Sequence, residues 1–148
     1  MLETFKVTAK KTSKGLQVET DARGFKFILD EPEALGGTNT GMNPVEALLC
    51  AFGACQSIVC ASFAESQDFN YDEFWIEVEG DLDPEGFMGI SDARNGFQEI
   101  RYSTHFVTDE PQDKIDAFSD FMDQHCPVSD NLQNGVKVIR TAAVKESR

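Results

Sequence analysis

One long apolar stretch, residues 44–64, constrains the fold more than any other part of the sequence. Asn43 can cap a helix here, Pro44 suits the first helical position, and Glu46 stands three residues after Asn43, as in a capping box. The sequence therefore predicts a helix that runs from Pro44 to about residue 64. Its apolar residues extend nearly all round, which predicts burial on most sides. A chain of 148 residues has few other helices to cover it, so we expect a second chain to supply part of the cover.

Short segments that alternate apolar and polar residues lie on both sides of this helix. Residues 4–30 predict an antiparallel meander, and glycines at 36, 37 and 41 then predict an irregular loop. Further strands are expected over residues 74–82, 100–106 and 136–144, with turns at 83–86, 95–96 and 134–135.

A second helix is predicted after Pro111, with Ile115, Phe118 and Met122 on one face. It should end near Cys126, because Pro127 disfavours helical geometry in the residue before it, and a polar turn should follow. The order of strands, helix, strands, helix and strand predicts a single α+β domain over residues 1–148 with mostly antiparallel pairing.

The charge balance and the absence of targeting signals exclude some partners and indicate the cellular compartment. A net charge of -13 argues against nucleic acid and anionic membranes as partners, because both repel an acidic surface. Glu46, Gln56, Ser57 and Ser62 interrupt the apolar stretch, which favours a buried helix over a membrane span. No signal-peptide pattern is found at the N-terminus, so we expect a cytoplasmic protein whose four cysteines are reduced thiols.

The spacing of the cysteines argues against a metal site. Cys50, Cys55 and Cys60 are five residues apart, and each step of five rotates about 140° around a helix, so neighbours do not share a face. No Cys-x-x-Cys pair exists, and His105 and His125 are the only histidines. No metal or cofactor is therefore predicted. Cys50 and Cys60 are interpreted as small core residues, and His125 is not expected to form a dyad with its sequence neighbour, Cys126.

Thiol redox chemistry is the remaining interpretation. Cys55 lies within the apolar helix and Cys126 lies at the end of the second helix, before a proline. A cysteine thiolate can attack a peroxide, and a second cysteine lets it recover through a disulfide. Considered alone, Cys55 is more simply a structural core cysteine, whereas a helix end beside a proline is a poor place for a packing residue.

Four stretches together resemble the OsmC/Ohr superfamily, which includes the organic hydroperoxide resistance proteins: residues 30–37, 41–49, 53–55 and 126–132. The resemblance covers nearly the whole chain. It implies an OsmC-like α+β fold in which antiparallel sheets pack around a long buried central helix, and an intertwined homodimer with two sites at the subunit interface. It also implies that Cys55 is the peroxidatic cysteine, that Cys126 is the resolving cysteine, and that an external dithiol such as a lipoyl group reduces their disulfide.

The same resemblance identifies candidate activators of Cys55. The arginine of strongly active members corresponds to Lys14, with Arg23 as the alternative. The glutamate position, ten residues before Cys55, holds Val45. Glu46 points about 100° away on the helix, and its role in the capping box is favoured. The pattern resembles a less characterised OsmC-like branch.

The sequence thus predicts thiol-dependent reduction of hydroperoxides in oxidative-stress defence, with organic peroxides favoured by an apolar pocket. One alternative is a non-enzymatic small-molecule binder or redox sensor on the same fold, which the replaced glutamate favours. Another is a structural dimer with inert core cysteines, which requires Cys55 and Cys126 to lie too far apart to join.

Overall fold

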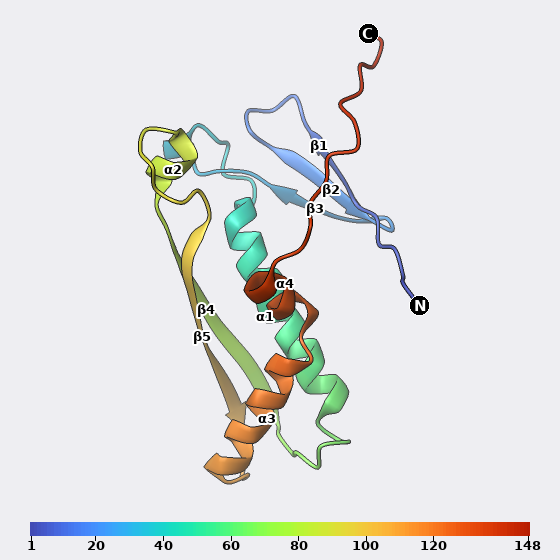
Figure 1. Cartoon of the computed structure of the whole chain (residues 1–148), viewed down its shortest axis with the longest axis vertical. Helices are drawn as coiled ribbons and strands as arrows, with labels where there is room; N and C mark the ends of the chain where they lie inside the picture. Colours follow the sequence, from blue (N-terminus) through green and yellow to red (C-terminus); the bar gives the residue numbers. More distant parts are fainter. The chain divides into compact units, whose positions relative to one another are not determined.

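The computed structural model describes residues 1–148, and Figure 1 shows its helices and strands. The chain divides into two compact units. Unit 1 comprises Met1–Gly53 and Glu77–Ser103, and unit 2 comprises Ala54–Ile76 and Thr104–Arg148. Three elements contribute residues to both units: α1 (Pro44–Phe63), β4 (Glu73–Leu82) and β5 (Phe97–Val107).

The N-terminal part of unit 1 is the predicted antiparallel meander. It consists of β1 (Thr8–Lys11), β2 (Val18–Ala22) and β3 (Phe25–Leu29), in the order β1-β2-β3. β1 begins later than the alternation from Phe5 indicated. The β2–β3 hairpin closes through Arg23 and Gly24, both with positive φ, as a tight two-residue turn requires.

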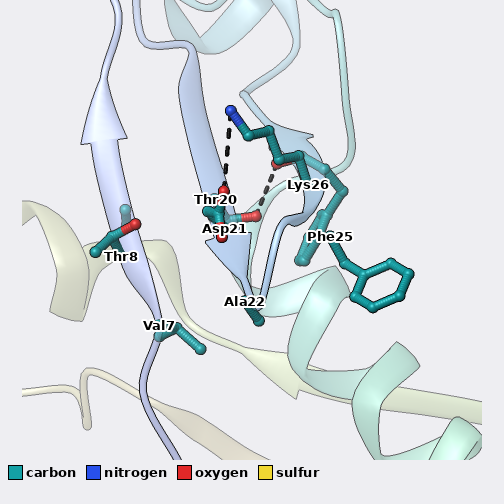
Figure 2. Close-up of a pocket in the computed structure, with 9 residues that line it drawn as sticks. Val7, Thr8, Thr20, Asp21, Ala22, Phe25 and Lys26 are labelled. Atoms are coloured by element: carbon teal, nitrogen blue, oxygen red, sulfur yellow. Dashed lines mark hydrogen bonds and ion pairs between the residues drawn. The ribbon is translucent and has the colours of Figure 1, made fainter.

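Large apolar side chains on this sheet are exposed. Val7 is 73% exposed, Phe25 is 69% exposed and Phe27 is 54% exposed. An open, mostly apolar groove lies over the strands, as Figure 2 shows, and its lining consists of Val7, Thr8, Ala9, Thr20, Asp21, Ala22, Phe25, Lys26 and Phe27. Such a surface on a single chain is typical of an interaction site.

A buried carboxylate organises the loop between β3 and α1. Asp30 is 3% exposed and accepts hydrogen bonds from the hydroxyls of Thr38 and Thr40 and from the N–H of Glu31. These bonds, led by the two hydroxyls, hold the pKa of Asp30 well below its usual range. Gly37 belongs to the same loop, and a Cβ there would lie 1.9 Å from the Glu31 carbonyl oxygen, so only glycine fits without a backbone shift.

The predicted capping box of α1 is confirmed. The N–H of Glu46 donates to Asn43 Oδ1 at 2.8 Å, and the N–H of Asn43 donates to Glu46 Oε1 at 2.9 Å. α1 ends at Phe63, close to the predicted residue 64.

The expected burial of α1 on most sides is not found in the single chain. Phe52, Gln56 and Val59 are buried, whereas Ile58 is 66% exposed and Leu48 is 39% exposed. By length and composition alone α1 could cross a membrane, but the core helix of a soluble protein meets the same criterion.

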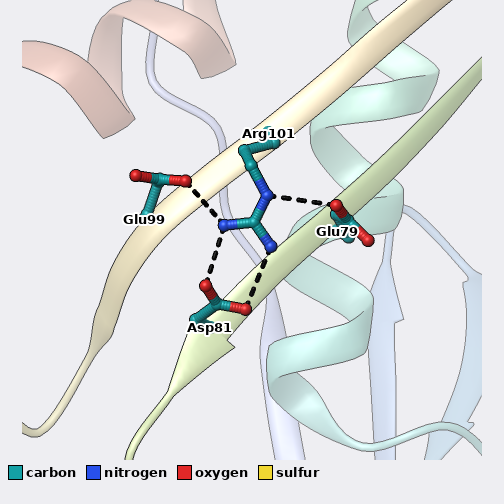
Figure 3. A network of polar contacts seen from close by, with 4 residues as sticks. All are labelled: Glu79, Asp81, Glu99 and Arg101. Atoms are coloured by element: carbon teal, nitrogen blue, oxygen red, sulfur yellow. Dashed lines mark hydrogen bonds and ion pairs between the residues drawn. The ribbon is translucent and has the colours of Figure 1, made fainter.

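β4 and β5 form a two-stranded sheet. In unit 1, Arg101 on β5 binds Glu79 at 3.0 Å, Glu99 at 2.6 Å and Asp81 at 2.8 and 3.0 Å, as Figure 3 shows. The three carboxylates, Asp81 first, raise the pKa of Arg101. Three carboxylates around one guanidinium form an ion-pair network, which fixes this part of the sheet more than an isolated surface pair would.

The segment after β4 differs from the predicted turn at 83–86. Asp83 accepts a hydrogen bond from the N–H of Glu85 at 2.9 Å and so caps a short helix, α2 (Pro84–Met88). The Asp-Pro pair is a turn signal, but it is equally an N-cap followed by a proline at the first helical position.

Unit 2 holds the main hydrophobic core, around α3 (Gln112–Gln124). The predicted apolar face of α3 is confirmed, because Phe118 and Met122 are buried there. The ring of Phe118 stacks on Phe69 with centroids 4.5 Å apart. Seven residues form the fully buried core: Val59, Cys60, Ala64, Phe69, Phe118, Met122 and Cys126.

Two predictions for the end of the chain are wrong. The segment after Cys126 is a helix, α4 (Pro127–Asn134), and not a polar turn. Residues 136–144 form no strand, and their apolar side chains are exposed, with Val138 at 88%. A strand needs a neighbour for its backbone hydrogen bonds, and this segment has none within the chain.

Candidate functional site

The two predicted redox cysteines lie together in unit 2. Cys55, on α1, is half-buried and packs against the hydrophobic core to which Cys126 belongs. Both are free thiols. The Cys55 and Cys126 side chains interact electrostatically, so two thiols 71 positions apart in the sequence are neighbours in this part of the core. This proximity argues against the interpretation in which the two side chains lie too far apart to join.

The backbone at Cys126 places its sulfur at the start of α4. Cys126 is the N-cap residue, with φ of -99° and ψ of 107°, and Pro127 follows at the first helical position. The N–H of Ser129 donates to Cys126 Sγ at 3.4 Å, a length suited to a sulfur acceptor. The sulfur therefore does what a serine or aspartate oxygen does in an ordinary N-cap.

The surroundings of Cys126 favour its protonated form. Burial raises the pKa of the Cys126 thiol above its usual value, because the thiolate loses its hydration. The N–H of Ser129 opposes this effect by stabilising the thiolate, and the contact with Cys55 raises the pKa further. At 3% exposure, Cys126 is also shielded from solvent, whereas Cys55 is more accessible.

A buried polar pair lies beside the cysteines. Gln56, directly after Cys55, is fully buried, and its Nε2 donates to Asp123 Oδ1 at 3.1 Å. No group of the chain donates to Gln56 Oε1. In the sequence, Gln56 is a polar interruption of the apolar stretch, and its position next to Cys55 is the feature that indicates a place beside the thiols.

His125 is not arranged as the partner of a reactive thiol. Its Nδ1 pairs with the Phe121 carbonyl oxygen at 2.8 Å, and its ring stacks on the Phe121 ring with centroids 4.0 Å apart. The ring also lies 5.4 Å from that of Phe63. These contacts account for His125 as a residue that packs the end of α3.

The remaining cysteines differ from each other. Cys60 is fully buried, as expected, and burial raises the pKa of its thiol, with a smaller opposing effect from its hydrogen bond to Tyr71. The interpretation of Cys50 as a core residue is wrong, because Cys50 is exposed. Steps of five residues carry Cys50 and Cys60 to different faces of α1, and only the face of Cys60 is covered.

The candidate activators Lys14, Arg23 and Glu46 all belong to unit 1. Lys14 is exposed in the β1–β2 turn, where its carbonyl accepts from the N–H of Gln17 at 2.9 Å. The Arg23 guanidinium lies over the ring of Phe25, 5.2 Å from its centroid. The Glu46 carboxylate is held in the capping box, as favoured. Activation of Cys55 by any of the three stays a prediction.

No group of three or more histidine, cysteine, aspartate or glutamate side chains is placed to hold a metal ion. The candidate site comprises two neighbouring free thiols, an apolar shell and one buried amide. These features define the class as an α+β protein with a pair of free cysteines in its core.

Comparison with known sequences agrees with that class. The family model of the OsmC-like proteins matches residues 37–140, and the chain belongs to this family. The match includes both Cys55 and Cys126. No curated protein sequence matches the chain.

Solved structures of the family share the fold. An OsmC-like protein from Mycoplasma pneumoniae superposes with a TM-score of 0.79 at 22% identity, over 90% of this chain and 89% of that one. An organic hydroperoxide resistance protein from Legionella pneumophila superposes with a TM-score of 0.68 at 21% identity, over 91% of this chain and 93% of that one. A third, from Elizabethkingia anophelis and solved with thiocyanate bound, gives 0.68 at 18% identity, over 90% of each chain. These likenesses establish the predicted OsmC-like α+β fold.

Proposed function

We propose that this protein is a thiol-dependent hydroperoxide reductase in oxidative-stress defence, with Cys55 as the peroxidatic and Cys126 as the resolving cysteine. The observation that carries the proposal is that the two free thiols are neighbours in the apolar core of unit 2. Membership of the OsmC-like family, which includes neighbours described as organic hydroperoxide resistance proteins, supports it.

The chemistry balances over three steps. The Cys55 thiolate attacks the O–O bond of a hydroperoxide and takes one oxygen as a sulfenic acid, while the other leaves as an alcohol after protonation. The Cys126 thiol then condenses with the sulfenic acid to a disulfide and releases water. An external dithiol, such as a lipoyl group on a partner protein, reduces the disulfide to two thiols and is itself oxidised to a disulfide.

The different environments of the two thiols support this division of roles. Cys55 is the more exposed of the pair, so a peroxide can reach it. Cys126 is buried, has a raised pKa and contacts Cys55, which suits a thiol that attacks only its neighbour. Lys14 or Arg23 is the proposed source of positive charge for the Cys55 thiolate. Replacing each with alanine tests that part, and an unchanged rate in both variants would exclude it.

Turnover with purified protein tests the proposal. Cumene hydroperoxide and a dithiol reductant should give steady turnover that Cys55→Ser abolishes, whereas Cys50→Ser on the same helix should leave the rate unchanged. Cys126→Ser should stop at the Cys55 sulfenic acid. No turnover above the Cys55→Ser background would refute the proposal. A higher rate with cumene hydroperoxide than with hydrogen peroxide is expected from the phenylalanines around the thiols, and equal rates would exclude that preference.

A non-enzymatic binder or redox sensor is the second candidate. It is favoured by Val45 at the usual glutamate position and by Glu46, whose carboxylate is held in the capping box. Mass spectrometry after one equivalent of peroxide separates the two functions. Rapid formation of a Cys55–Cys126 disulfide supports the reductase, and slow oxidation spread over several cysteines supports the binder.

We further propose that the chain works as a cytoplasmic homodimer. The exposed apolar groove on β1, β2 and β3, the exposed Ile58 on α1 and the unpaired segment 136–144 all support a partner chain. Light scattering should give twice the 16.4 kDa of one chain. A monomer at the concentration used for turnover would exclude the dimer as the active form.

A further inference from the structure

The Gln56 side chain is an unusual group for the place it occupies. It is fully buried on α1, and its Oε1 receives no hydrogen bond from the chain. Leaving a buried acceptor without a donor costs about 1–3 kcal/mol. Leucine or methionine would fill a similar volume without that cost, so the stability of the core does not account for a glutamine here.

The one hydrogen bond that the Gln56 amide makes joins the two elements that carry the thiols. Gln56 is the residue after Cys55 on α1, and Asp123 lies three residues before Cys126, at the end of α3. Asp123 lies in the last turn of α3, and Cys126 follows that helix as the N-cap of α4. The 3.1 Å bond from Gln56 Nε2 to Asp123 Oδ1 therefore links the turn of α1 with Cys55 to the last turn of α3 before Cys126.

The hydrogen bond between Gln56 and Asp123 is well suited to fix the separation of α1 and α3 beside the two thiols. The acceptor is a carboxylate, and hydrogen bonds to a charged partner are shorter and stronger than those between neutral groups. Gln56 is fully buried and Asp123 is half-buried, so water competes little at the Gln56 amide. The surrounding contacts of α1 and α3 are apolar and non-directional, and they tolerate small shifts that a disulfide, with its narrow geometry, does not.

We propose that Gln56 is a positioning residue: through Asp123 it sets the effective concentration of the Cys126 thiol at Cys55 and so the stability of their disulfide. The inference rests on the proposed function for its biological role, since it concerns the same two thiols. It does not require a peroxide, because the disulfide can be formed and measured by exchange with a dithiol.

The experiment is a redox titration of the full-length protein in buffers of oxidised and reduced dithiothreitol. Two protein thiols and oxidised dithiothreitol exchange with the protein disulfide and reduced dithiothreitol, and mass spectrometry counts both forms. Gln56→Leu should lower the equilibrium constant for the disulfide about tenfold, which for this two-electron couple makes the reduction potential about 30 mV less negative. The reduced variant should unfold at the same or a higher urea concentration than wild type.

Three further variants separate positioning from packing. Asp123→Asn keeps an oxygen that can accept from Gln56 but loses the charge, so it should shift the potential less than Asp123→Ala does. Asp123→Ala should shift the reduction potential by as much as Gln56→Leu does. A variant that combines Gln56→Leu with Asp123→Ala should shift the potential no further than either change alone. Val59→Ala removes buried volume one turn along α1, so it should lower stability while leaving the potential unchanged.

The titration tests the positioning role of Gln56 separately from the proposed peroxide reduction. An unchanged potential in Gln56→Leu, or equal shifts in Gln56→Leu and Val59→Ala, would overturn the positioning role. A wild-type protein that forms no Cys55–Cys126 disulfide would overturn it as well. A disulfide with the expected shift but no peroxide turnover would leave this inference standing and remove only the proposed function.

Discussion

The Cys126 sulfur caps α4 and contacts Cys55, and two substitutions separate these roles. Cys126→Ser keeps an acceptor for the N–H of Ser129 and loses the thiol, whereas Cys126→Ala loses both. Serine is among the most favourable N-cap residues and alanine is among the least favourable. The hydroxyl that Cys126→Ser introduces could also donate to the Cys55 sulfur, so its burial leaves no group unpaired.

The expected difference in stability follows from the cap. Exchanging serine for alanine at an N-cap costs about 1 kcal/mol, which is about a fivefold change in the unfolding equilibrium. For a chain of this size, that corresponds to a shift of about 2–4 °C in Tm. α4 has only eight residues, so the loss of one cap affects a large part of it.

Urea unfolding of the reduced proteins measures this difference. Cys126→Ala should unfold at a lower urea concentration than Cys126→Ser with the same slope, and Cys50→Ser should match wild type because Cys50 is exposed. Neither Cys126 variant can form the disulfide, so both should lack that product after peroxide. An alanine variant at least as stable as the serine variant would refute the capping role of the sulfur.

Three other predictions concern elements that position the site. Asp30→Asn should make the free energy of unfolding depend less on pH in acid. Because the pKa of Asp30 is lowered in the folded protein, its carboxylate stabilises the fold above the unfolded-state pKa of about 3.9, and this stabilisation is lost as pH falls below that value. Urea unfolding across acid pH measures the effect. Asn43→Ala should lower the free energy of unfolding by about 1 kcal/mol through loss of the capping box, with no effect on the potential of the Cys55–Cys126 disulfide. Phe118→Ala should lower the free energy of unfolding by about 3–5 kcal/mol, because it leaves a cavity where a buried ring stacks on Phe69. Calorimetry should show a large fall in Tm. A small fall would count against Phe118 as the centre of the core.

Local signals in the sequence were sufficient where the structure depends on near neighbours. Asn43, Pro44 and Glu46 specify the start of α1 within four residues, and the structure has the expected pair of hydrogen bonds. The meander of β1, β2 and β3 follows from alternation and glycine turns for the same reason. In each case the residues that decide the conformation are adjacent in the chain.

The prediction failed where one residue type serves two local structures. Pro127 ends α3, as predicted, but it also occupies the first position of α4, where its missing N–H costs nothing. Cysteine is not a usual N-cap residue, so no local pattern indicated a helix after Cys126. Apolar and polar residues alternate over residues 136–144 as they do in a strand. Such alternation indicates which side chains would share a face of a sheet, but it does not identify the neighbouring strand that would accept the backbone hydrogen bonds.

The site shows the same division between local and distant information. The resemblance indicated Cys55 and Cys126, but their contact depends on how α1 and α3 pack through Phe118, Met122 and their neighbours. Glutamine side chains are mostly exposed in proteins. Gln56 is fully buried, and its amide pairs with the carboxylate of Asp123, which is distant in the sequence and could not be identified from it.

The position of Cys126 at the N-terminus of α4 explains how a buried cysteine could act in the resolving role proposed for it. Burial keeps the thiol protonated and so protects it from direct attack on peroxide. Condensation with a sulfenic acid still requires negative charge to develop on this sulfur, and the N–H of Ser129 is already aimed at it at 3.4 Å. A donor that is in place before the reaction stabilises that charge without rearrangement. The same cap that holds α4 in the reduced protein would thus assist the step that forms the disulfide.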